Sequence, residues 1–188
     1  MTWARDAMAA GQGRPARDGT TKGGAMGRSA RRVPTASDRQ AGGSVLRTGV
    51  LLGIGTIGAL DEIVLHQLVQ WHHFYDHGDE FGRIVSDGLL HLFTLALLLL
   101  GAFRLWSTRR AIGAVMSARQ LRAGVLLGMG GFQLFDGVVN HKVLRLHQIR
   151  ADVDNVLPYD VAWNGVALLL LAAGWISLTS DRSAGGQK

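Results

Sequence analysis

The chain has 188 residues, enough for one domain, and 47% of them are hydrophobic, gathered in four apolar blocks from about Gly49 onward. It has no cysteine, which excludes a disulfide framework and a thiolate metal site. A net charge of +6 and an isoelectric point near 10.7 would suggest nucleic acid as the partner of a soluble protein. The basic residues instead lie where a membrane protein keeps them, so we expect a lipid bilayer and no nucleic acid as the partner.

Residues 1–46 are rich in Arg, Gly, Ala and Ser and have no apolar periodicity. Such a segment cannot bury enough surface to offset the entropy lost on ordering, so we predict a disordered basic tail. No apolar stretch follows its charges, which excludes a secretory signal.

The stretch 47–73 recurs 75 residues later in the chain. It reads RTGVLLGIGTIGALDEIVLHQLVQWHH, and from Arg122 the chain reads RAGVLLGMGGFQLFDGVVNHKVLRLHQ. The pairs that match without a gap are Arg47/Arg122, Gly49/Gly124, Gly53/Gly128, Gly55/Gly130, Asp61/Asp136, His66/His141 and His72/His147. A register kept through two histidines and an aspartate indicates a duplicated helical hairpin.

Each apolar block is long enough to cross a hydrocarbon core of about 30 Å as a helix. The predicted spans are 48–69, 84–103, 123–144 and 159–178. We therefore predict an all-α fold, a four-helix transmembrane bundle built from two tandem parallel hairpin repeats. The predicted parts are the tail 1–46, hairpin 47–107, a basic link 108–121, hairpin 122–180 and a C-terminal tail 181–188.

Charge in the connections predicts the orientation. The tail and the link 108–121 are basic, whereas the connection 72–83 holds one arginine against three acids. Lys and Arg gather on the cytoplasmic side, so we expect a multi-pass plasma-membrane protein with both termini and the link cytoplasmic. Both hairpin tips then face outward, as in parallel repeats related by a pseudo-two-fold axis along the membrane normal.

Each copy of the repeat contains a G-x-x-x-G motif, Gly49 with Gly53 and Gly124 with Gly128. Glycines at this spacing let helix backbones approach closely. The motif is common in membrane helices, so it predicts packing and indicates nothing about function.

The candidate site residues lie in the outer halves of the spans or in the tips. All seven histidines are found there, and each predicted span brings one aspartate, Asp61, Asp87, Asp136 or Asp160, to a similar depth. Ionisable groups within a span are costly and normally face the bundle interior, where they pair or bind something. Asp87-x-x-x-His91 in the second span corresponds to Asp160-x-x-x-Asn164 in the fourth.

Helical geometry restricts how these groups combine. At 100° per residue Asp61 and His72 share one face, and His66 lies about 140° away from Asp61. We therefore expect that one helix cannot present all three groups to one ion. The favoured arrangements join His66 with His141 across the pseudo-two-fold axis, or His66 with Asp87 and His91 within one hairpin.

Imidazole with carboxylate suits Zn, Fe, Mn or Cu(II), whereas Cu(I) prefers sulfur ligands. The candidate metal ligands are His66, His72, Asp87, His91, His141 and His147. Haem is the other candidate cofactor, with His66 and His141 as axial ligands on facing helices. Asp61, Asp136 and Asp160 would orient ligating imidazoles, and Asn164 stands where the repeat predicts a counterpart of His91.

These motifs resemble a family of bacterial integral membrane proteins, the domain-of-unknown-function family 2243. The resemblance is carried by GALDEIVLHQLVQWHH from Gly58, SDGLLH from Ser86, GGFQLFDGVVNHKVLRLHQIR from Gly130 and YDVAWN from Tyr159. It covers about residues 47–178 and implies a small four-span membrane protein. It implies no activity and no catalytic residues.

A membrane protein that binds a metal ion or haem near the outer leaflet is the leading hypothesis. The alternatives are a proton- or ion-translocating relay that uses the same Asp and His residues, and an assembly protein for a larger membrane complex. An enzyme is the least favoured, because the sequence has no nucleophile elbow, phosphate loop or nucleotide fingerprint. A homodimer is plausible for so small a bundle.

Overall fold

The computed structural model describes residues 35–108 and 114–183, and these residues form two helical hairpins. The expected tail up to residue 34, the centre of the link and the last five residues lie outside the described part. The four long helices are α1 (Ala36–Asp61), α2 (Glu80–Thr108), α3 (Ala114–Phe135) and α4 (Leu157–Ser183). In each hairpin the first helix is followed by a short π-helix, η1 (Glu62–Leu68) after α1 and η2 (Asp136–Val143) after α3. The predicted all-α bundle of two tandem hairpins is confirmed.

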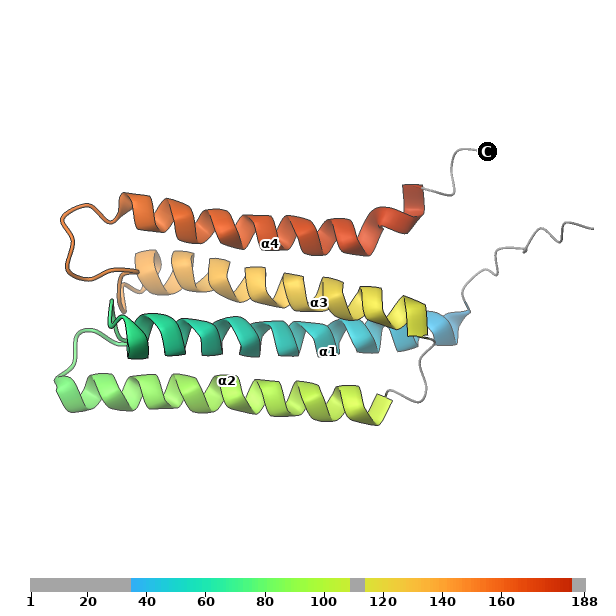
Figure 1. Cartoon of the computed structure of the whole chain (residues 1–188), viewed down its shortest axis with the longest axis horizontal. Coiled ribbons are helices and arrows are strands. Elements are labelled where there is room, and N and C mark those ends of the chain that lie inside the picture. The colour runs from blue at the N-terminus through green and yellow to red at the C-terminus, as the bar shows by residue number, and fades with distance from the viewer. Residues whose placement is uncertain (1–34, 109–113, 184–188) are drawn as a thin grey trace, which may run out of the picture. The chain divides into compact units, whose positions relative to one another are not determined.

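The helices lie side by side in the order α2, α1, α3, α4 (Figure 1). The first helices of the two hairpins form the central pair, and each outer helix packs against its own hairpin partner. Among the described residues α2 makes no contact with α3 or α4. The centre of the bundle is therefore the α1/α3 interface, where the two copies of the repeat meet.

α1 begins at Ala36, so the prediction that the chain is disordered up to residue 46 is wrong for 36–46. The local sequence carries a start signal, because Thr35 precedes the helix and its carbonyl accepts the Arg39 N–H at 3.1 Å. Tertiary packing holds the added turns, since Val45 is 2% exposed and Gly42 lies against the Gln120 side chain of α3. The apolar pattern missed this segment because two consecutive glycines interrupt it.

The G-x-x-x-G motifs form the crossing of α1 and α3, as predicted. A methyl group on Gly49 would come within 2.5 Å of the Leu121 carbonyl, and one on Gly124 would meet the Leu46 carbonyl. Gly53 and Gly128 make the next matching pair, against the carbonyls of Val125 and Val50. The backbones touch because these four residues have no side chains.

The pseudo-symmetry extends to the outer helices. Gly55 packs against Thr94 and Leu98 of α2, and its counterpart Gly130 packs against α4. In the outer helices Gly101 contacts Leu52 of α1, and Gly174 contacts the equivalent Leu127 of α3. The duplication seen in the sequence is thus a duplication of contacts.

Within the described residues, three helices are long and apolar enough to cross a membrane, over Arg39–Leu68, Glu80–Ser107 and Leu157–Ser180. α3, the predicted third span, is not among them, although it lies between α1 and α4. Two arginines, Arg119 and Arg122, stand in its first half.

Candidate metal centre

Both central helices change from α to π geometry at the aspartate of the repeat. The π-helix joins residues five apart by its hydrogen bonds and so brings them to one side. Asp61 and His66 are five apart, as are Asp136 and His141. The expectation that His66 lies about 140° from Asp61 is therefore wrong, because it assumed α-helical rotation. His66 Nε2 lies 3.7 Å from Asp61 Oδ2, and His141 Nε2 lies 3.0 Å from Asp136 Oδ2.

Each π-helix is followed by a residue in the left-handed region. Gln70 has a φ of 50° and its counterpart Arg145 has a φ of 53°. This turn ends the helix and changes the direction of the chain. His72 and His147 therefore stand on the tips and not on a continued helix face, which is how they approach the aspartates.

Reciprocal backbone hydrogen bonds join the two hairpin tips. The Asp76 N–H donates to the Leu146 carbonyl at 3.0 Å, and the Ala151 N–H donates to the Trp71 carbonyl at 3.1 Å. Each bond is the pseudo-symmetric equivalent of the other, so the tips form an isologous junction.

The same exchange fixes the tip histidines. His72 Nδ1–H donates to the Ile149 carbonyl at 2.8 Å, and His147 Nδ1–H donates to the Phe74 carbonyl at 2.9 Å. Burial lowers the pKa of His72 to about 3 and that of His147 to about 4. Both rings are therefore neutral at pH 7, and each keeps a lone pair on Nε2, the nitrogen that faces inward.

Four imidazole rings gather beneath the junction. Within each hairpin the two ring centroids are 4.5 Å apart, His66 with His72 and His141 with His147. Across the axis, His66 and His147 are 6.3 Å apart and His72 and His141 are 6.1 Å apart. The tip rings of His72 and His147 stack at 4.6 Å with an interplanar angle of 6°.

Among the described residues, two equivalent groups of three side chains, one from each hairpin, have the separation that a metal ion requires. In each group one atom per residue lies within 4.8 Å of the other two. The groups are Asp61, His66, His72 and Asp136, His141, His147. All six side chains are buried. Asp61, His66, His72 and His147 each have a buried nitrogen or oxygen without a hydrogen-bond partner among the described residues, whereas His141 Nε2 and Asp136 Oδ2 face each other at 3.0 Å.

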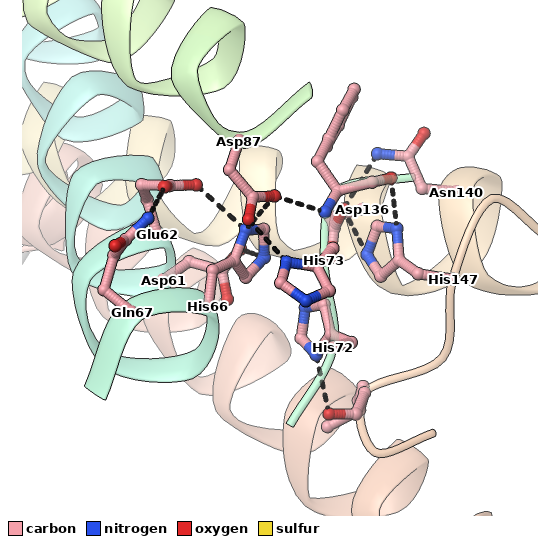
Figure 2. Close-up of polar contacts among 12 residues, drawn as sticks. Asp61, Glu62, His66, Gln67, His72, His73, Asp87, Asp136, Asn140 and His147 are labelled. Atoms are coloured by element: carbon pink, nitrogen blue, oxygen red, sulfur yellow. Dashed lines mark hydrogen bonds and ion pairs between the residues drawn. The ribbon is translucent and has the colours of Figure 1, made fainter. Parts of the chain in front are cut away.

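The first hairpin adds two carboxylates behind His66. His66 Nδ1 lies 2.9 Å from Glu62 Oε2 and 3.0 Å from Asp87 Oδ1 (Figure 2). Asp87 also accepts from His73 Nδ1 at 2.7 Å and from the Phe74 N–H at 2.7 Å. With Nδ1 facing two carboxylates, His66 presents Nε2 to Asp61 and the other rings. Glu62, His66 and Asp87 form a third group with metal-binding separation.

The second hairpin has no equivalent support. Gly137 replaces Glu62, and the Asn164 side chain packs against it. Asp160, the counterpart of Asp87, pairs with Lys142 at 2.5 Å instead of His141. His141 Nδ1 is buried without a hydrogen-bond partner among the described residues.

Most predicted site residues come together, and His91 does not. It is exposed on α2, because the buried stripe of that helix runs through Asp87, Leu90 and Thr94 and His91 lies beside it. Asp160 and Asn164 lie on α4, where Asp160 pairs with Lys142 and the Asn164 amide donates to the Asp160 carbonyl. Asn140 was missed: its amide donates to Asp136 Oδ1 at 2.8 Å, and its i, i+4 spacing from Asp136 was the available signal.

Residues 48–181 match the family described as "Predicted membrane protein (DUF2243)". The chain belongs to this family. It is therefore a membrane protein of the family whose motifs the sequence resembles. Comparison with the curated proteins found no match, and comparison with the solved structures found none.

Proposed function

We propose that the chain is a membrane protein that binds a transition-metal ion where the two hairpin tips meet. The observation that carries the proposal is the two groups of buried side chains whose nitrogen and oxygen atoms lie within 4.8 Å of one another in each group. An unprotonated imidazole nitrogen beside a carboxylate oxygen is repulsive unless a proton or a metal ion lies between them. His147 Nε2, for example, faces Asp136 Oδ1 at 3.7 Å.

The donor set defines the class of ion. Four imidazole nitrogens and two carboxylate oxygens suit Zn, Fe, Mn or Cu(II), and the absence of cysteine from the sequence disfavours Cu(I). Each group offers two histidines and one carboxylate, which leaves coordination positions open for water or another ligand.

Haem fits the geometry less well. A haem with His66 and His141 as axial ligands would need a wide flat space between the two rings. The His72 ring centroid lies 4.5 Å from that of His66 and 6.1 Å from that of His141, and so occupies this space. The ring packing therefore favours a bare ion.

The charge distribution supports a plasma-membrane location with the tips outside and both termini cytoplasmic. In that orientation the metal centre lies near the outer leaflet. The four-span topology includes α3 as a span between α1 and α4. A dimer or a larger membrane complex remains compatible with this arrangement.

The test is metal analysis of the purified full-length chain in detergent, by mass spectrometry. We expect at least one near-stoichiometric transition metal, which is lost when His72 and His147 are both replaced by alanine. His91→Ala is the matched control, because it removes an exposed imidazole and should keep the metal. A folded protein that takes up none of the four candidate metals would contradict the proposal.

A proton relay is the second candidate, and one observation favours it. His73, whose side chain is 28% exposed, is joined through Asp87 to the buried His66. On the other side of the four rings, however, α1 and α3 touch through glycine backbones. Proton flux in vesicles that falls in Asp87→Asn, together with a metal-free protein, would favour the relay.

A further inference from the structure

We propose that the centre holds two ions and that the first hairpin binds its ion more tightly than the second. This inference rests on the proposed function, because it requires that the cluster binds metal at all. The first site is Asp61, His66 and His72, and the second site is Asp136, His141 and His147.

The stacked tip rings separate the two sites. A metal ion lies in the plane of the imidazole that binds it, along the nitrogen lone pair. The His72 and His147 rings are stacked 4.6 Å apart with planes only 6° from parallel. Two stacked parallel planes share no point, so one ion cannot lie in both.

The remaining rings divide in the same way. Each tip ring stands edge-on to the helix ring of its own hairpin at 4.5 Å, closer than to the helix ring of the other hairpin. The carboxylates divide between the hairpins in the same way, since Asp136 lies within 3.7 Å of both His141 and His147. Each hairpin therefore completes a set of two imidazoles and one carboxylate from its own residues.

The two sites differ in what holds the helix histidine. Glu62 and Asp87 both face His66 Nδ1, and their side chains are buried. An imidazole whose outer N–H donates to a carboxylate is oriented and made more basic, and losing such a partner typically weakens metal binding by about 10–100-fold. His141 has no such partner among the described residues.

The second site has one contact that the first lacks. Asn140 orients Asp136, whereas the equivalent position in the first hairpin is Leu65. This is a single neutral donor, set against two buried carboxylates at His66. The first site should therefore bind its ion more tightly than the second.

The experiment is a Co²⁺ titration of the metal-free full-length protein in detergent, followed by calorimetry and visible absorption. We expect two steps, with dissociation constants that differ by about 10–100-fold. Glu62→Gln keeps its acceptor for Gln67 and should weaken the tighter step by about tenfold or more, leaving the weaker step unchanged. Asp87→Asn should act in the same direction.

Asp160→Asn is the matched control for Asp87→Asn, because it changes the equivalent carboxylate in the second hairpin. It should leave both steps unchanged, since Asp160 pairs with Lys142 and not with His141. The Co²⁺ absorption band of the first equivalent should shift in Glu62→Gln. The thermal midpoint of the metal-free variant shows whether packing alone has changed.

The outcomes separate this inference from the proposed function. A single bound ion would overturn the two-ion arrangement and leave metal binding intact. Two steps of equal affinity, or a Glu62→Gln variant that weakens both steps equally, would overturn the ranking. Wild-type protein that binds no Co²⁺ would contradict the proposed function itself.

Discussion

The two hairpin tips have the same backbone and the same four-ring packing, but they differ in the side chains behind the rings. Residues that determine geometry occur in both halves, such as the aspartate at the change from α to π geometry and the tip histidine that donates to the opposite tip. Behind the helix histidine the first half has Glu62 and Asp87, and the second half has Gly137 and an aspartate paired with Lys142. Duplication therefore supplied the frame of the centre, and divergence behind the frame made its halves unequal.

The largest effect should come from filling the α1/α3 crossing. Gly53→Leu and Gly128→Leu each force a side chain into a facing carbonyl, and overpacking of this kind costs roughly 1–3 kcal/mol or more. We expect both variants to lower the thermal midpoint in detergent by similar amounts, because the two contacts are equivalent. Gly131→Leu is the control, since nothing lies within 4 Å of its added carbon. Unequal decreases in the thermal midpoint would show that the two glycine contacts are not equivalent.

Removing a tip histidine should abolish one site and spare the other. We expect His72→Ala to remove the tighter Co²⁺ step and His147→Ala to remove the weaker one. Each ligand belongs to a different group, so the remaining group is still complete. Counting bound Co²⁺ by mass spectrometry checks this. Loss of both ions in both variants would mean that the halves do not act independently.

A smaller change should widen the difference between the halves. Asn140→Leu places in the second hairpin the residue that the first hairpin has at Leu65. Asp136 then loses the amide that orients it, and we expect the weaker Co²⁺ step to weaken further by about tenfold. An unchanged weaker step, measured by calorimetry, would show that Asn140 has no role in the site.

The smallest effect concerns the turns after the π-helices. Gln70 and Arg145 adopt positive φ, which costs a non-glycine residue roughly 1–2 kcal/mol. Gln70→Gly and Arg145→Gly should relieve part of this cost, offset by the greater entropy of glycine in the unfolded chain, for a net gain of a few tenths to about 1 kcal/mol. Chemical unfolding in detergent should give similar gains for both. A loss of stability in either variant would show that its side chain contributes more than its backbone costs.

The repeat, the two hairpins and the glycine crossing could be predicted, because each depends on residue spacing that the α-helix preserves. The close approach of Asp61, His66 and His72 could not be predicted in this way, because a rotation of 100° per residue places Asp61 and His66 on different faces of an α-helix. The i, i+5 spacing of Asp and His, present in both copies, was the available sign of π geometry. His91 was placed in the site from its i, i+4 relation to Asp87, but the order of the helices leaves it on an outer face.

The exchange of hydrogen bonds at the tips has an evolutionary consequence. A single hairpin would leave the Nδ1–H of its tip histidine without the acceptor that the other hairpin provides. A half-length ancestor would therefore have built the centre only as a homodimer, and gene fusion would then have freed each half to change alone. Two hairpins produced as separate chains, cut within the link between α2 and α3, should reassemble and bind Co²⁺ together. Either hairpin that binds Co²⁺ with wild-type affinity on its own would argue against this origin.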